Sequence, residues 1–343
     1  MAASVPAADL DHILAHTGDI WRELAGTRIF ITGGTGFFGV WLLEAIAAAN
    51  DTLKVGVGVT VLSRDPASFL ARMPHLAVRP EFAWLTGDTM DFVFPDGTFD
   101  YVIHLATASA EKLGAGDTAL TLTTLLGTQR ILQFARICRA RRLLLASSGA
   151  VYGRQPPELG HIPETYPGAP NPQHRASTYG EIKRMSELMC ALTPEVECII
   201  ARGFSFYGPH LPFTEKFAIG SFIRDAIEGG PIRIHGDGTP VRSYLYAADL
   251  AIWLVTLLLK GKPNQPYNVG SDRAIGLAEL ARQVAATTCG VTVEIAHAPT
   301  TGLPDRYVPD IQKARGELGL DILTPLSLGL ERTVDWAARL PRR

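Results

Sequence analysis

The chain is 343 residues long with a formal net charge of −2, so it can hold one large domain or two ordinary ones and carries no basic surface for nucleic acid. Its longest apolar run, Leu250 to Leu259, is too short to cross a bilayer, and its start lacks the basic region and apolar core of a secretion signal, so the cytoplasm is the expected compartment. The four cysteines show neither metal-like nor redox-like spacing, and the sequence predicts no metal site.

The elements predicted from hydrophobic periodicity alternate along the chain. An amphipathic helix over Asp9 to Leu24 comes first and is expected to pack on the outside of the neighbouring domain. The predicted strands are Arg28–Thr32, Val55–Leu62, Phe82–Leu85, Tyr101–Leu105 and Arg142–Ser147. The helices among them are Phe38–Ala49, Thr118–Cys138 and Ser177–Leu192. These strands are apolar on both faces, which is typical of a parallel sheet covered by helices.

A glycine-rich turn joins the first of these strands to the next helix. Gly33 permits the tight bend, Gly36 lets backbone N–H groups approach a phosphate, and Gly39 lets helix and strand pack closely. The helix N-terminus adds a partial positive charge at the same place. The order strand, glycine turn and helix therefore predicts a site for a dinucleotide pyrophosphate.

Short strand–helix units of this kind predict an α/β fold with a doubly wound parallel sheet, the Rossmann arrangement, whose ligands sit at the carboxyl ends of the strands. After Pro209 the spacing becomes irregular, which indicates a smaller, mixed α/β C-terminal lobe that faces the substrate. We expect a helical extension over residues 1–26, a dinucleotide-binding domain over 27–208 and a substrate-binding lobe over 209–343. The chain is expected to return to the first domain around residues 240–270.

A second group of residues predicts the chemistry. Tyr179 and Lys183 are four apart on a predicted helix and therefore share a face, where an ammonium group would favour the phenolate and lower the pKa of the phenol. Ser148 comes after a strand and could donate a hydrogen bond to a substrate oxygen. Taken singly, a Tyr-x-x-x-Lys pair often occurs by chance on a solvent-exposed helix, and a serine after a strand is usually a turn residue. The three residues together, after the glycine turn, indicate a catalytic group.

With these motifs in this order, the chain resembles the extended short-chain dehydrogenase/reductase family, and within it the NAD-dependent epimerase/dehydratase branch that acts on nucleotide sugars. The resemblance extends from Thr27 to the C-terminus. Besides the residues above, the matching segments are Gly87-Asp88, His104-Leu-Ala106, Gly127-Thr128, Tyr207-Gly-Pro209, the stretch from Gly236 to Asp249, Tyr267-Asn-Val-Gly-Ser271 and Arg306-Tyr-Val-Pro-Asp310. The segments after residue 209 are the specific ones, because simpler short-chain reductases lack them.

The resemblance implies a set of binding residues. Ser148, Tyr179 and Lys183 would be catalytic, and Ser205, Arg242 and Arg306 would contact the substrate, a nucleotide-diphosphate sugar, with the two guanidinium groups on phosphate oxygens. The alternative for each arginine is that it forms an ion pair at the surface and does not contact the substrate. The implied cofactor contacts are Gly33, Thr35, Gly36, Phe37, Phe38, Gly39, Ser63, Arg64, Asp88, Leu105, Ala106, Thr107, Tyr179 and Lys183.

The choice between NAD and NADP depends on the end of the second strand. An acidic side chain there would accept hydrogen bonds from the ribose 2′-OH of NAD. This chain has Ser63 and Arg64 at that point, which suit a 2′-phosphate and lean toward NADP. Asp65 could still turn inward and serve NAD, and a solvated Arg–Asp pair in a turn is a third interpretation.

The resemblance also implies a mechanism, hydride transfer at a sugar carbon, usually C4. Tyr179 would take the hydroxyl proton, Lys183 would hold the cofactor ribose and tune Tyr179, and Ser148 would polarise the oxygen. The 4,6-dehydratases of the family carry an Asp-Glu pair where this chain has Gly149 and Ala150, and the decarboxylating members carry a glutamate at the second position. Dehydration and decarboxylation are therefore disfavoured.

We expect a 4-epimerase, with an NADPH-dependent 4-keto-sugar reductase as the alternative within this class. A cofactor-sensing binding protein without turnover is the alternative from another class, although the retained Ser148, Tyr179 and Lys183 argue against it. Relatives usually pair through the helices that carry the tyrosine and lysine, so a homodimer is expected. The apolar positions Ile182, Met185, Leu188 and Met189 permit this pairing, but burial in the domain's own core explains them equally well.

Overall fold

The structure is a computed structural model that describes residues 4–107, 118–215, 217–299 and 301–340. Its centre is a seven-stranded sheet with the order β11-β6-β5-β4-β1-β2-β3, in which every neighbouring pair is parallel. The strands are β1 (Arg28–Thr32), β2 (Gly58–Ser63), β3 (Phe82–Thr86), β4 (Tyr101–His104), β5 (Arg142–Ser148), β6 (Glu197–Gly203) and β11 (Pro266–Val269). The strand order reverses between β1 and β4, where a crevice forms beyond the carboxyl ends of the strands. The predicted doubly wound parallel sheet is confirmed.

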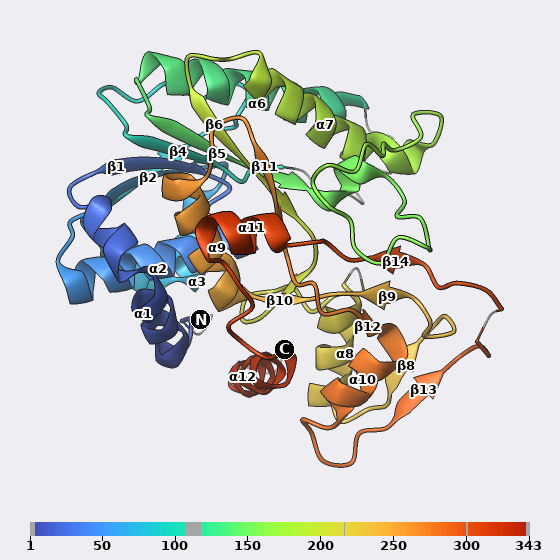
Figure 1. The fold of residues 1–343 in the computed structure, drawn as a ribbon. Coiled ribbons are helices and arrows are strands. Elements are labelled where there is room, and N and C mark those ends of the chain that lie inside the picture. The colour runs from blue at the N-terminus through green and yellow to red at the C-terminus, as the bar shows by residue number, and fades with distance from the viewer. Residues whose placement is uncertain (1–3, 108–117, 216, 300, 341–343) are drawn as a thin grey trace.

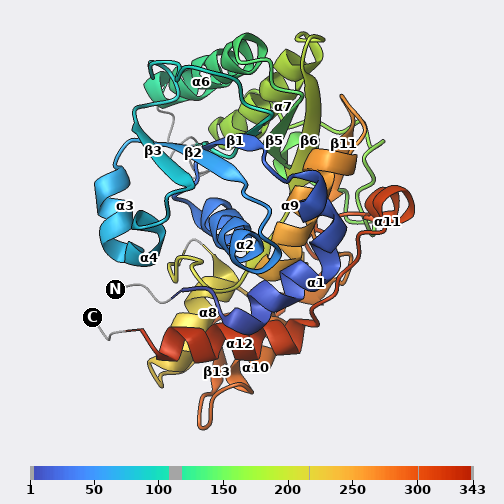
Figure 2. The same ribbon diagram turned by 90° about the vertical axis from the view of Figure 1, so that its left-hand side faces the viewer.

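Helices cover both faces of this sheet. Figures 1 and 2 show α6 (Thr118–Ile137) and α7 (Thr178–Ala191) on one face and α2 (Phe37–Leu53) and α9 (Ala247–Lys260) on the other. Every residue of α9 up to Leu259 is buried, which explains the apolar run found there, because a helix surrounded by protein is apolar on all sides. Within the described ranges, no helix is both long enough and apolar enough to span a membrane.

Part of the chain after β6 builds a smaller lobe beside the sheet. It contains α8 (Ala218–Ile227) and α10 (Leu277–Ala285), packed on the parallel pair β8 (Ile232–Ile234) and β13 (Val293–Ile295). A small sheet of β12 (Ile275–Gly276), β9 (Val241–Arg242) and β14 (Arg306–Tyr307) lies between this lobe and the large sheet in Figure 1. The other elements are α3 (Pro66–Arg72), α4 (Pro74–Ala77), β7 (Phe206–Tyr207), β10 (Leu245–Tyr246), α11 (Gln312–Leu318) and α12 (Leu326–Ala338).

All five predicted strands occur; four of them end one residue from the predicted position, one starts three residues later, and two further strands join the same sheet. β2 begins at Gly58 rather than Val55, because left-handed backbone at Lys54 (φ 54°) and Gly56 (φ 65°) ends α2 and turns the chain first. The added strands, β6 and β11, pair with each other at the sheet edge although they lie far apart in the sequence. The division of the chain at residues 208 and 209 stays a prediction.

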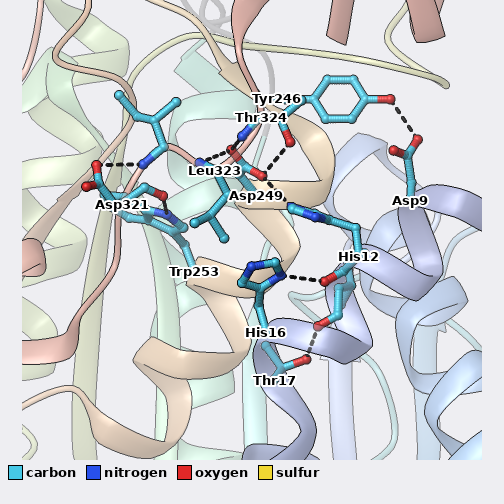
Figure 3. A network of polar contacts seen from close by, with 12 residues as sticks. Asp9, His12, His16, Thr17, Tyr246, Asp249, Trp253, Asp321, Leu323 and Thr324 are labelled. Carbon is cyan, nitrogen blue, oxygen red and sulfur yellow. Dashed lines mark hydrogen bonds and ion pairs between the residues drawn. The ribbon is translucent and has the colours of Figure 1, made fainter. Parts of the chain in front are cut away.

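The N-terminal helix α1 (Ala7–Glu23) is fastened to the core by buried polar contacts. Figure 3 shows Asp249, a buried residue of α9, at the centre of this network. Its carboxylate accepts hydrogen bonds from the backbone N–H groups of Leu323 and Thr324 at 2.9 and 2.8 Å and from the Thr324 hydroxyl at 2.8 Å. His12 Nε2 of α1 lies 3.2 Å from the same carboxylate. One buried charge thus joins α1 to the segment before α12.

A second carboxylate, that of Asp9, reinforces this connection. It is fully buried and accepts hydrogen bonds from Tyr246 Oη at 2.7 Å and from Arg332 Nη1 of α12 at 2.5 Å. Burial raises the pKa of Asp9, and these two partners oppose the rise. Figure 2 shows α1 and α12 side by side. The extension is therefore an integral part of the fold rather than a helix that merely rests on its outside.

Candidate active site

The chain leaves β1 through the glycine turn, where neighbouring backbone leaves no room for side chains. Gly33 has φ +72°, and a Cβ there would lie 2.6 Å from the backbone nitrogen of Ala106. A Cβ at Gly39 would lie 2.3 Å from Gly34 Cα, so the start of α2 packs directly on the turn. The N-terminus of α2 has no side-chain cap and no acidic residue in its first turn. Its partial positive charge is therefore available to a phosphate group.

A cavity of about 890 Å³ runs along this turn at the carboxyl ends of the strands, within the usual size range of ligand pockets. The predicted cofactor-binding residues that line it are Gly33, Thr35, Gly36, Ser63, Arg64, Asp88, Leu105, Ala106 and Thr107. Phe37 and Phe38 line a neighbouring cavity instead. Sequence reasoning missed Arg72, which lines both cavities, because only the packing of α3 against β3 brings it there.

At the end of β2, this cavity presents two arginines and a serine. Ser63 is buried, whereas Arg64 is exposed and Arg72 lies at the end of α3. Asp65, the acidic residue that could have served a ribose, is the N-cap of α3, and its Oδ1 accepts a hydrogen bond from the Ser68 backbone N–H at 2.9 Å. This cap commits one carboxylate oxygen to the helix.

The three predicted catalytic residues meet beside this cavity. Ser148 ends β5, and its hydroxyl lies close enough to the phenol of Tyr179 on α7 to lower the pKa of that phenol. Lys183 Nζ lies 5.9 Å from the centroid of the Tyr179 ring. It donates hydrogen bonds to Thr107 Oγ1 and to the carbonyl oxygen of Ala146, both at 2.6 Å. The lysine thereby connects α7 to Thr107 in the wall of this cavity.

Burial controls the charges in this group. It lowers the pKa of Lys183 to about 7, with Glu187 acting weakly in the opposite direction. Burial also raises the pKa of Tyr179, and the nearby Ser148 hydroxyl opposes that rise. The expectation that the ammonium lowers the pKa of the phenol is therefore wrong for the protein groups by themselves, because the desolvation of a phenolate outweighs them and Lys183 points its hydrogen bonds elsewhere.

Supporting contacts hold these elements in place. His104 at the end of β4 is hydrogen-bonded to Thr32 at the end of β1, with 2.7 Å between Nδ1 and Oγ1. Burial lowers the pKa of His104 to about 3, so the imidazole is neutral and its role is to join the two strands. Glu187, one turn after Lys183, accepts hydrogen bonds from Ser147 Oγ at 2.5 Å and from Arg202 Nη2 at 2.6 Å, which fixes α7 to β5 and β6.

A second cavity, of about 670 Å³, adjoins the first on the side of the small lobe. The predicted substrate residues Ser205 and Arg242 line it, together with Phe204, His210 and Tyr244, which sequence reasoning missed. Arg242 Nη2 pairs with Asp305 Oδ2 at 2.7 Å. Arg306, the third predicted substrate residue, is absent from the described lining of both cavities, and its buried Nε has no hydrogen-bond partner among the described residues.

A further tyrosine, Tyr307, reaches the catalytic group from β14. Burial raises the pKa of its phenol, the nearby Ser148 hydroxyl opposes that rise, and its ring lies against Phe204 with 4.7 Å between centroids. The sequence analysis selected its neighbour, Arg306. Adjacent residues of a strand point to opposite faces, so only one of the two could face the site, and the sequence did not show which. Among the described residues, no cluster of His, Cys, Asp or Glu could hold a metal ion.

Comparisons with known proteins agree with this geometry. The model of the NAD dependent epimerase/dehydratase family matches residues 29–270. UDP-glucuronic acid decarboxylase 1 from Xenopus tropicalis is 30% identical over 314 residues, which cover 90% of this chain and 72% of the relative. A dTDP-glucose 4,6-dehydratase structure from Streptomyces venezuelae, with NAD bound, is 26% identical with a TM-score of 0.75 and covers 90% of this chain and 96% of that one. UDP-glucose 4-epimerase from Thermotoga maritima shares the fold at 22% identity, with a TM-score of 0.73 and coverage of 90% and 98%.

The buried ammonium predicts a pH dependence of stability. The unfolded chain holds the Lys183 proton up to about pH 10.5, whereas the folded chain releases it near pH 7, so the unfolded state binds more protons in between. The free energy of unfolding of the native protein, relative to Lys183→Met, should therefore rise with pH by up to about 1.4 kcal/mol per unit between these values. Urea unfolding from pH 6 to 10 measures it.

The exposed Lys54 provides the matched control for this prediction. The difference between the native protein and Lys54→Met should show no comparable rise over the same range. A flat difference for Lys183→Met as well would contradict the burial of a neutral amine.

Proposed function

Because the chain belongs to the NAD dependent epimerase/dehydratase family, we propose that it is a nucleotide-sugar 4-epimerase that works by reversible hydride transfer at C4 of the sugar. The observation that carries the proposal is the composition of the reaction centre. The side-chain groups that meet at Ser148 are hydroxyls, those of Tyr179 and Tyr307. Such a centre suits the removal and return of a hydroxyl proton.

The residues divide this work. The Tyr179 phenolate accepts the proton of the sugar hydroxyl, and Ser148 donates a hydrogen bond to the same oxygen as the carbonyl forms. The nicotinamide cofactor, held in the 890 Å³ cavity, supplies the hydride acceptor. Lys183 stands between that cavity and the phenol through Thr107. In an epimerase the keto sugar then turns over and receives the hydride on its other face.

Elimination and decarboxylation are disfavoured by the two residues after Ser148. Gly149 and Ala150 carry no acidic group, and a Cβ at Gly149 would lie 2.6 Å from Tyr307 Oη. A carboxylate side chain at that position therefore has no space. The relatives that reach 30% identity are named UDP-glucuronic acid decarboxylases, so this chain would differ from them at the reacting residues rather than in the fold.

The substrate's diphosphate would lie in the 670 Å³ cavity. Arg242 there presents a planar fork that matches phosphate oxygens, and Asp305 holds the fork in place through the 2.7 Å ion pair. Ser205 adds a hydroxyl to the same wall. A sugar attached to this diphosphate would then extend past Phe204 toward Ser148.

Purified protein should interconvert two UDP- or dTDP-sugars that differ at C4, without added cofactor. Tyr179→Phe should reduce turnover about 10²–10⁴-fold with little change in substrate affinity, because the general base is lost while the pocket remains. Tyr166→Phe, outside the site, is the control. A chromatographic assay of both sugars measures the rates, and near-native turnover of Tyr179→Phe would disprove the assignment.

We propose NADP as the preferred cofactor. Arg64 and Arg72 both line the cavity beside Ser63, and two guanidinium groups and a hydroxyl suit a 2′-phosphate. Asp65 is engaged as the cap of α3. The same observation favours the alternative function, an NADPH-dependent 4-keto-sugar reductase, because a reductase consumes its cofactor. Turnover that requires NADPH and a 4-keto sugar would establish the reductase instead of the epimerase.

Arg64→Ala tests the cofactor proposal. Loss of one charge-assisted hydrogen bond should weaken NADP binding about 10–100-fold and leave NAD binding nearly unchanged. Arg141→Ala removes an exposed arginine at the opposite end of β5 and should alter neither. Isothermal titration calorimetry with NAD and NADP gives the ratio of mutant to native dissociation constant for each dinucleotide. An equal loss of affinity for NAD and NADP would refute the 2′-phosphate contact.

We propose a homodimer formed through α6 and α7. These helices pack side by side, and their outer faces expose Leu122 and Leu126 on α6 and Met185 and Leu188 on α7. Ile182, considered with them from the sequence, is buried within the chain's own core. A continuous apolar strip on two helices suits a second copy of the same surface.

Leu188→Glu should convert the dimer to a monomer, because it places a charge in the centre of this apolar strip. Val78→Glu, at an exposed position after α4, is the control and should leave the mass unchanged. Sedimentation equilibrium measures both. A native protein that sediments as a monomer would end this proposal without affecting the proposed reaction.

A further inference from the structure

The N-terminal helix is connected to the wall of the 670 Å³ cavity through buried side chains. Arg242 and Tyr244 line this cavity, and the segment that carries them continues into β10, which ends at Tyr246. Tyr246 is fully buried, and its hydroxyl donates to the Asp9 carboxylate of α1 at 2.7 Å, as Figure 3 shows. A lining residue of the cavity therefore lies only two positions from a residue that α1 holds.

Tyr207 packs against both tyrosines of this segment. β10 runs parallel to β7 with Tyr246 opposite Tyr207, and the two rings have 5.3 Å between centroids. The ring of Tyr244 meets that of Tyr207 edge-on, with 6.5 Å between centroids. The Leu245 backbone N–H donates to the carbonyl oxygen of Ser205, another lining residue, at 3.0 Å. Packing is thus continuous from α1 to the cavity wall.

The helix α12 packs on the same rings. Tyr207 Oη donates to the first carbonyl oxygen of α12 at 3.2 Å. A Cβ at Gly329 would lie 2.8 Å from Tyr207 Cζ and 2.8 Å from Tyr246 Cδ2, so no side chain fits between the helix and these rings. Arg332, one turn further along α12, donates to Asp9 at 2.5 Å. The Asp9 carboxylate therefore holds α12 on the two tyrosines in addition to its bond with Tyr246.

The burial of Asp9 makes these contacts costly to break. A carboxylate inside a protein is tolerated only while its donors stay in place, because an unpaired charge there has lost its hydration. Asp9 is fully buried, so a displacement of either donor would leave part of it unpaired. Both α1 and α12 lie outside residues 29–270, the part that matches the family model, so that match assigns them no role.

We propose that Asp9 is a positioning residue that, by holding Tyr246 and α12, fixes the segment of residues 241–246 and with it the contacts of Arg242 and Tyr244 to a nucleoside diphosphate. The part about the segment concerns the protein alone, and the part about the diphosphate rests on the proposed function. α1 thus acts on the substrate cavity from outside, since none of the described lining residues of either cavity belongs to α1.

Asp9→Ala removes both contacts of the carboxylate. Titration calorimetry with UDP and with dTDP measures nucleotide binding, and amide hydrogen exchange follows the peptide that covers residues 241–246. The dissociation constant of the nucleotide should rise about 3–30-fold, and this peptide should exchange faster. NADP affinity should stay near that of the native protein, because the described lining of the 890 Å³ cavity includes neither Arg242 nor Tyr244.

Thr17→Ala is the matched control on the same helix. Thr17 is nearly as buried as Asp9, but its hydrogen bonds, to Ile13 and from Trp21, stay within α1. It should lower thermal stability without changing nucleotide binding or the exchange of residues 241–246. Asp9→Asn keeps an acceptor oxygen for Tyr246 and should recover part of the lost affinity. If Asp9→Ala does not fold, Tyr246→Phe removes one of the two contacts and keeps the ring.

Weaker nucleotide binding and faster exchange in Asp9→Ala, with neither in Thr17→Ala, support the proposal. In turnover, KM should then rise more than kcat falls, because Arg242 and Tyr244 bind the nucleotide rather than exchange protons. The same changes in a protein that converts no sugar would refute the proposed reaction and leave the role of Asp9 intact.

Native binding and native exchange in folded Asp9→Ala, or equal changes in Thr17→Ala, would overturn the proposal. A native protein that binds neither UDP nor dTDP would overturn the part about the diphosphate together with the proposed substrate. The exchange of residues 241–246 would then decide the part about the segment by itself.

Discussion

The burial of one ammonium group organises the catalytic region. The amino group of Lys183 is buried and donates two hydrogen bonds, one to the carbonyl of Ala146 in β5 and one to Thr107 beyond β4. Its backbone belongs to α7, so a single side chain ties the helix that carries Tyr179 to two strands and to the cofactor cavity. Because desolvation makes the charge costly, these contacts must be kept, and this requirement maintains the geometry of the whole group.

The reactivity of the phenol depends on the hydroxyls around it more than on that ammonium. Burial raises the pKa of Tyr179, and the group that opposes the rise is Ser148. Ser148 in turn is shared with Tyr307 and the Ala150 backbone. Among the described residues, the side chains that interact with Ser148 thus carry hydroxyl groups.

Two pairs of residues show how a fold shared with other enzymes acquires its own chemistry. Gly149 and Tyr307 exclude a carboxylate from the reaction centre by volume. Asp65, by capping α3, commits an acid that could have faced a ribose and leaves Arg64 and Arg72 on the cavity wall. Asp65 still lines that cavity, with one of its two carboxylate oxygens committed to the helix cap.

The sequence by itself determined the features that arise within a few consecutive residues. The glycine turn, the strand ends and the one-turn spacing of Tyr179 and Lys183 are local, because the helical repeat and the needs of a tight turn act over short distances. Only the tertiary structure decided the others. Tyr307 meets Ser148, β11 joins β6, and Asp9 meets Arg332 across most of the chain. These contacts depend on register and packing between distant segments, and the burial that sets the pKa values of Lys183 and Tyr179 exists only once those segments have come together.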